Sequence, residues 1–95
     1  MARQRHKPLD LDAASALALQ GLGFLAADAD RLSRFLALTG MGPGELRASA
    51  GSAHFQAAVL DYLLGDESLL LVFSAETGIA PESVAPAHAL LCGEG

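Results

Sequence analysis

Apolar residues recur along the chain at the spacing of an α-helix, and short polar or glycine-containing segments separate the runs. The first run places apolar side chains three or four residues apart, the spacing that puts them on one helix face: Leu11, Ala14, Ala18, Leu22 and Leu25. Asp10 or Asp12 can accept hydrogen bonds from the free N–H groups of its first turn. The pattern therefore predicts an amphipathic helix that begins near residue 10.

Two glycines interrupt this first predicted helix, Gly21 and Gly23. Each costs up to about 1 kcal/mol of helix stability relative to alanine. The cost is explained most simply if another helix crosses closely at this point, and the alternative is a locally weak helix.

Two later helices are expected between an aspartate and a Thr-Gly pair. The first follows Asp28 and ends at Thr39-Gly40, and the second follows Asp66 and ends at Thr77-Gly78. Aspartate favours the N-cap, and glycine favours the left-handed residue that ends a helix. In the first of the two, the side chains expected to face inward are Leu32, Phe35, Leu36 and Leu38.

Three more helices complete the predicted set. Pro43 opens a short helix that reaches about Ala50, and Ser52 caps a longer one that ends at Gly65. The last helix opens at Pro81-Glu82, and Pro86 within its first turns predicts a late start or a kink.

A constant offset of 38 residues relates the two halves of the chain. It carries Thr39-Gly40-x-x-Pro43 onto Thr77-Gly78-x-x-Pro81 and Asp28 onto Asp66, since 77 − 39, 81 − 43 and 66 − 28 all equal 38. The shared register favours an internal repeat over residues 12–50 and 51–88. The alternative is a chance match between helices rich in Leu and Ala.

These elements predict an all-α fold: a single compact domain of five to six helices over residues 9–95, arranged as two similar helix–helix–helix units. Hydrophobic residues make up 52% of the chain and aromatic residues 5%. The core must therefore consist mainly of Leu and Ala, and the scarcity of Val and Ile argues against a sheet. Residues 1–8 are expected to form a flexible basic arm.

Charge is distributed unevenly along the chain, whose net charge is −5. Every basic side chain lies in the first half: Arg3, Arg5, Lys7, Arg31, Arg34 and Arg47. The C-terminal half is acidic and apolar, which disfavours nucleic acid as a partner for that half. A nucleic-acid-associated protein that uses the basic arm with Arg31, Arg34 and Arg47 remains the alternative to a protein-interaction module.

Cellular location follows from the cysteine count and the N-terminus. The single cysteine, Cys92, cannot form an internal disulfide, which favours a reducing compartment and the cytoplasm. Asp10 and Asp12 stand where the apolar region of a signal peptide would begin, and no apolar run is long enough to span a bilayer.

Three segments together resemble a known family: residues 16–25 (ALALQGLGFL), 34–40 (RFLALTG) and 59–67 (VLDYLLGDE). They are similar to a family of short bacterial proteins known only as a domain of unknown function. The resemblance implies a small cytoplasmic helical protein and supplies no catalytic residues.

Few residue groups suggest chemistry. His88 and Cys92 share a helix face and are metal-ligand types, but a zinc site needs three or four protein ligands and no second pair exists. His54 and Asp61 are seven residues apart, two helical turns, which is too far for a direct hydrogen bond. We therefore expect no catalytic residue, metal or cofactor, and a non-enzymatic protein.

The candidate partner-binding residues surround the corner between the fourth and fifth predicted helices: Asp61, Tyr62, Asp66, Glu67, Leu69 and Val72. The acidic residues and the tyrosine are equally compatible with a helix cap, solvated charges and a core aromatic residue. The run Leu69–Phe73 is apolar on all sides, so it must be buried or bind a partner or a second copy. We expect burial, with this helix at the centre of the domain.

Overall fold

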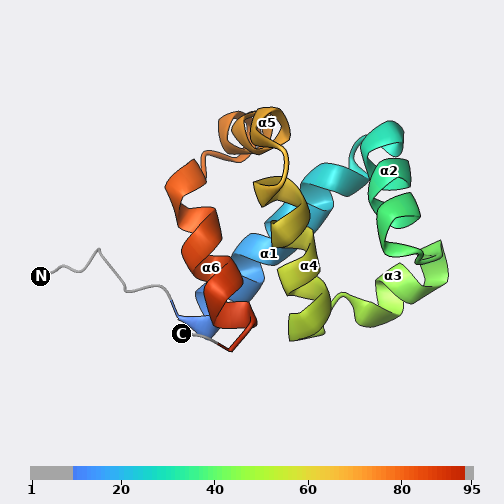
Figure 1. Cartoon of the computed structure of the whole chain (residues 1–95), viewed down its shortest axis with the longest axis horizontal. Coiled ribbons are helices and arrows are strands. Elements are labelled where there is room, and N and C mark those ends of the chain that lie inside the picture. Colours follow the sequence, from blue (N-terminus) through green and yellow to red (C-terminus); the bar gives the residue numbers. More distant parts are fainter. Residues whose placement is uncertain (1–9, 94–95) are drawn as a thin grey trace, which may run out of the picture.

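A computed structural model describes residues 10–93, and within them the chain forms six α-helices and one 3₁₀ turn, with no strand (Figure 1). Their bounds are α1 Leu11–Ala26, α2 Ala29–Thr39, α3 Pro43–Ser49, α4 Ala53–Leu64, α5 Glu67–Thr77, η1 Pro81–Ser83 and α6 Val84–Leu91. The predicted fold class is confirmed: a single, all-α globular domain. The basic arm, residues 1–8, lies outside the described residues.

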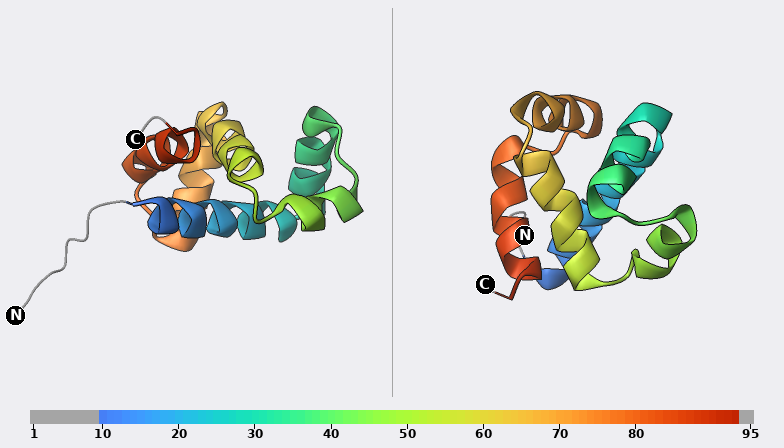
Figure 2. Two further views of the ribbon diagram at one scale, coloured as in Figure 1. Left: turned by 90° about the horizontal axis from the view of Figure 1, so that it is seen from below. Right: turned by 45° about the vertical axis from the view of Figure 1, so that its right-hand side comes forward.

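The core is built where α1, α4 and α6 pack against one another. Figure 2 shows α4 and α6 on the same side of α1, which is the longest helix. Their apolar faces bury side chains of moderate size: Ala14, Leu25, Val59, Leu60, Leu63, Val84 and Ala87. Burial of these side chains is the main stabilising contribution to a domain of this composition.

The crossing of α1 and α4 explains one of the two glycines in α1. Gly21 is buried, and a Cβ atom at this position would lie 3.2 Å from both Val59 Cγ1 and Leu63 Cδ1 of α4. Gly21 therefore allows the close helix approach that the sequence predicted. Gly23 is exposed, and a Cβ atom there would meet nothing within 4 Å, so the prediction was wrong for that glycine.

An aromatic cluster attaches α2 to the rest of the domain. Phe35 of α2 is fully buried, and its ring makes edge contacts with Phe55 (5.8 Å between centroids) and Tyr62 (5.2 Å), both on α4. Such edge-to-face pairs are favourable beyond their burial. Figures 1 and 2 show α2 and α3 together at the far end of α1, away from α6.

The ends of α2 and α5 have the same local structure at the offset of 38 residues. Asp28 and Asp66 are the N-caps, and Gly40 and Gly78 end the helices at φ values of 74° and 78°. The last residue of each helix is a threonine, Thr39 or Thr77. Its hydroxyl donates a hydrogen bond to the carbonyl four residues earlier and accepts one from the N–H two residues later. The two turns are thus equivalent; that residues 12–50 and 51–88 superpose as whole units stays a prediction.

The last predicted helix begins late, as expected for a segment with a proline in its first turns. Pro81–Ser83 form the 3₁₀ turn η1, and the α-helix starts only at Val84, so Pro86 falls in its first turn. A proline is tolerated there because the first N–H groups of a helix have no intrahelical partner.

The expectation that α5 lies at the centre of the domain was wrong. Only Phe73 of this helix is fully buried, while Leu71 is 52% exposed and Val72 is 39% exposed. The physical reason is that α1, α4 and α6 pack mainly against one another and form the core, which leaves α5 at one edge of the domain. Two other apolar residues expected inward, Leu11 and Leu38, are 55% and 71% exposed.

Candidate functional site

One side of α5 is an exposed apolar surface with an acidic residue at each end. We call it the outer face of α5 and define it by six exposed residues: Glu67, Ser68, Leu71, Val72, Ala75 and Glu76. They share one side of the helix because they follow one another at spacings of three and four. Leu71 and Val72 are its apolar centre, and both are among the exposed large hydrophobic residues of the described part of the chain.

The opposite side of α5 holds the helix to the core. Phe73 packs its ring edge against Phe24 of α1, with 5.4 Å between the centroids. Leu69 and Leu70 are half-buried and pack against the same core. Because these side chains face inward, a run that is apolar at every position has a definite outer side, and Leu69 lies mainly on the inner one.

Acidic groups dominate the surroundings of the outer face. Asp66 caps α5 by accepting a hydrogen bond from the Leu69 N–H (3.1 Å), and Glu67 lies in the first turn, where the positive end of the helix dipole favours it. Glu76 lies one turn beyond Val72, and its Oε2 is 4.0 Å from Nη2 of Arg31 on α2. No lysine or arginine follows Arg47 in the sequence.

Two other predicted partner-binding residues point to different neighbours. Asp61 is exposed, and its Oδ1 lies 3.8 Å from Nε2 of His88 on α6. Tyr62 is half-buried against Phe35 of α2. The tyrosine is therefore part of the aromatic cluster, and the structure does not bring it together with Asp61 in one docking patch.

A small surface cluster contains Asp61, His88 and Cys92. The sequence indicated the pair His88 and Cys92, but not the proximity of Asp61. Sγ of Cys92 is 3.7 Å from Nε2 of His88, the same nitrogen that faces Asp61. A hydrolytic triad would use one imidazole nitrogen for the carboxylate and the other for the nucleophile. Here the carboxylate and the thiol face the same nitrogen, so the cluster does not have the arrangement of a triad. Among the described residues, no group of three or more His, Cys, Asp and Glu side chains could hold a metal ion.

The arginines do not all remain free for an acidic partner. Arg31 is half-buried, its guanidinium lies 4.3 Å from the centroid of the Phe24 ring, and it faces both Asp28 and Glu76 at 4.0 Å. Arg34 and Arg47 are exposed. Arg3, Arg5 and Lys7 lie outside the described residues.

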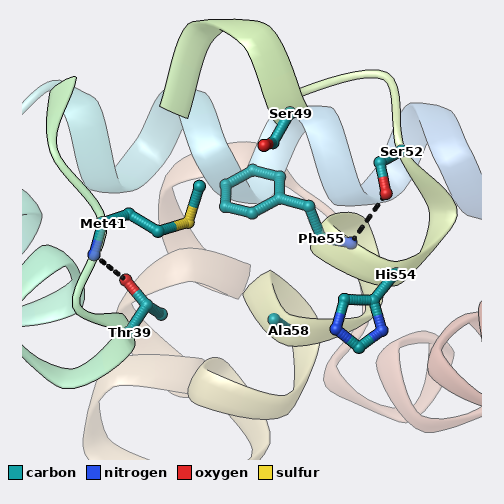
Figure 3. A pocket seen from close by; sticks show the side chains of 7 residues that line it. All are labelled: Thr39, Met41, Ser49, Ser52, His54, Phe55 and Ala58. Atoms are coloured by element: carbon teal, nitrogen blue, oxygen red, sulfur yellow. Dashed lines mark hydrogen bonds between the residues drawn. The ribbon is translucent and has the colours of Figure 1, made fainter. Parts of the chain in front are cut away.

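A hollow lies between the segment that joins α2 to α3 and the first turns of α4 (Figure 3). Its volume is about 340 Å³, and seven residues line it: Thr39, Met41, Ser49, Ser52, His54, Phe55 and Ala58. Figure 3 shows Met41 and Phe55 directed toward one another, with His54 and Ser52 on another side. Sequence reasoning missed this hollow because its residues come from three elements and form no motif.

Comparisons with known proteins are consistent with the sequence resemblance. One family model matches residues 11–94, and its description is "Protein of unknown function (DUF3572)". No curated protein and no solved structure matches the chain. Within the described residues, none of the helices has both the length and the apolar character needed to cross a membrane.

Proposed function

The chain belongs to the DUF3572 family, and because the description of that family assigns no activity, we propose a function from the surface of the protein itself. The protein is a small, non-catalytic interaction module of the cytoplasm. Its outer face of α5 binds an amphipathic helical segment of a partner protein, one that carries apolar residues on one side and lysine or arginine around them.

The observation that carries this proposal is the exposure of Leu71 and Val72 at the centre of the outer face. Leaving large apolar side chains in water is unfavourable, and adjacent ones form a contact for another apolar surface. The corresponding positions of α2 at the offset of 38 are Ser33 and Arg34, so the helix itself does not require apolar residues there.

The acidic residues around the outer face of α5 favour a partner that carries positive charge. Glu67 and Glu76 stand at the two ends of the outer face, and Asp66 precedes it. A basic partner would meet opposite charges, which raises the rate of association and disfavours other partners. A second copy bound by the same face would bring these carboxylates toward one another across a two-fold axis, which disfavours a symmetric dimer.

A defined peptide tests the proposal without knowledge of the natural partner. The probe is a synthetic amphipathic helix with leucine on one side and lysine on the other, and its control carries glutamate in place of lysine. We expect saturable binding of the lysine peptide, measured by fluorescence anisotropy, and a lower affinity at higher salt. The glutamate peptide should not bind.

Variants of the protein then locate the contact. Leu71→Gln combined with Val72→Gln removes the apolar centre while the charges stay unchanged, and we expect about a tenfold or greater loss of affinity. The matched control is Leu38→Gln, which alters an exposed leucine on α2 and should leave binding unchanged.

Two results would contradict the proposal. One is equal affinity for the double variant and the Leu38→Gln control. The other is a dimeric mass in solution for the unmodified protein that becomes monomeric in the double variant, because the face would then be covered by a second copy.

The alternative, association with nucleic acid through the basic arm and Arg31, Arg34 and Arg47, gains no support from a specific contact. Arg31 is engaged with Phe24, Asp28 and Glu76. A titration with single- and double-stranded oligonucleotides at low salt would detect this activity by its steep salt dependence.

A further inference from the structure

The hollow between α2, α3 and α4 has an apolar side and a polar side. Met41, Phe55 and Ala58 provide the apolar surface, and Phe55 is almost fully buried behind it. Ser49, Ser52 and His54 provide polar atoms. A volume of about 340 Å³ is at the lower end of the range for small-ligand pockets, which combine apolar walls with a few convergent polar groups.

The hydrogen bonds of the lining residues show which polar groups remain available. The Thr39 hydroxyl donates to the Phe35 carbonyl (3.0 Å) and accepts from the Met41 N–H (3.4 Å), so it is occupied by its own turn. The Ser52 oxygen accepts from the Phe55 N–H (3.3 Å), which leaves the hydroxyl proton of Ser52 to donate elsewhere. His54 is exposed, and an imidazole always carries at least one N–H donor.

From this arrangement we propose that the hollow binds a small organic carboxylate whose apolar body, an aromatic ring or a short alkyl chain, lies against Met41 and Phe55. The hydroxyls of Ser49 and Ser52 and the imidazole of His54 receive the carboxylate. This site lies at the start of α4 and is separate from the outer face of α5, so it does not depend on the interaction proposed above.

Electrostatics favours an anion in the hollow in an otherwise acidic protein. None of the seven lining residues carries a carboxylate, although the chain has a net charge of −5. Ser52 and His54 lie at the N-terminal end of α4, where the helix dipole is positive, whereas Ser49 is the last residue of α3. A neutral molecule of the same shape would gain the apolar contacts without this contribution.

The probe for this site is phenylacetate, and its neutral counterpart is phenethyl alcohol, which has a hydroxymethyl group in place of the carboxylate. Each is titrated into the ¹⁵N-labelled full chain. We expect saturable shifts of the backbone amides of the lining residues with phenylacetate, with a Kd of about 1 mM or lower for so small a ligand. Phenethyl alcohol should bind several-fold more weakly.

Variants separate the apolar and polar contributions. Ala58→Leu places a larger side chain in the hollow and should weaken phenylacetate binding at least tenfold, whereas the same change at exposed Ala16 on α1 should have no effect. His54→Ala should weaken phenylacetate more than phenethyl alcohol. Because His54 is exposed, this variant keeps the test decisive if Ala58→Leu fails to fold, which circular dichroism would reveal.

Three outcomes would overturn the proposal. The first is the absence of saturable shifts up to the solubility of phenylacetate. The second is binding whose shifts lie away from the hollow and persist in Ala58→Leu. The third is equal binding of the acid and the alcohol with no effect of His54→Ala, which would remove the assignment to carboxylates.

Discussion

Replacing Gly21 with leucine tests the crossing of α1 and α4 on which the core depends, and Gly23→Leu is its matched control. Both glycines lie in α1, so both substitutions gain about 0.8 kcal/mol in helix propensity. They differ only in their surroundings, because Gly21 faces α4 and Gly23 faces open space. The comparison therefore isolates the contribution of the helix crossing.

The structure sets the expected magnitude. A Cβ atom at position 21 would already lie 3.2 Å from side chain carbons of Val59 and Leu63, closer than an ordinary van der Waals contact, and leucine adds three further carbons. Overpacking of this kind costs about 1–3 kcal/mol. Since the propensity gain cancels between the two variants, Gly21→Leu should be less stable than Gly23→Leu by about 1–3 kcal/mol.

Urea unfolding followed by far-ultraviolet circular dichroism measures this difference. In a domain of this size, each 1 kcal/mol corresponds to a shift of about 4–8 °C in Tm, so a thermal scan gives an independent value. Equal stability of the two leucine variants would show that α4 does not approach Gly21, and the described packing of α1 against α4 would be refuted.

Three further substitutions, one of them with a control at a second glycine, test other contacts. Asp66→Ala removes the N-cap of α5 and should cost about 1 kcal/mol in the same urea assay; an unchanged midpoint would contradict the capping role. Gly78→Ala places a side chain at a positive φ and should cost about 1–2 kcal/mol, whereas Gly44→Ala, inside α3 and facing open space, should stabilise the protein slightly. Phe35→Leu should cost about 1–2 kcal/mol and alter the near-ultraviolet circular dichroism of Tyr62, the single tyrosine; an unchanged signal would mean that the two rings do not touch.

Local chemistry allowed the helix ends to be predicted from the sequence. Asp28 and Asp66 were identified as caps, and Gly40 and Gly78 as the residues that stop their helices, because these roles depend on a side chain acceptor or on a positive φ within a few residues. The late start of the last helix followed from Pro86 in the same way.

The position of α5 could not be predicted by the same reasoning. Five successive apolar residues contain no polar side chain to mark the solvent side, so the run fits a buried helix and a half-exposed one equally well. The buried side is set by packing against α1, where the ring of Phe24 meets Phe73. This is a contact between distant parts of the chain.

The candidate functional residues divide in the same way: the sequence indicates some of them, and only the packing of separate helices brings the others together. Val72 and Glu67 were identified because they belong to a contiguous segment, and both lie on the outer face of α5. The proximity of Asp61 to His88 and the hollow beside His54 arise from packing between separate helices. No spacing in the sequence indicates such contacts.

The most direct test of the proposed function is to identify which backbone amides of the ¹⁵N-labelled protein shift when the leucine–lysine peptide is added. Our account predicts that the largest shifts cluster along the outer face of α5, around Leu71 and Val72, and decrease toward α2. Shifts centred instead on other elements, with those two residues unaffected, would contradict it.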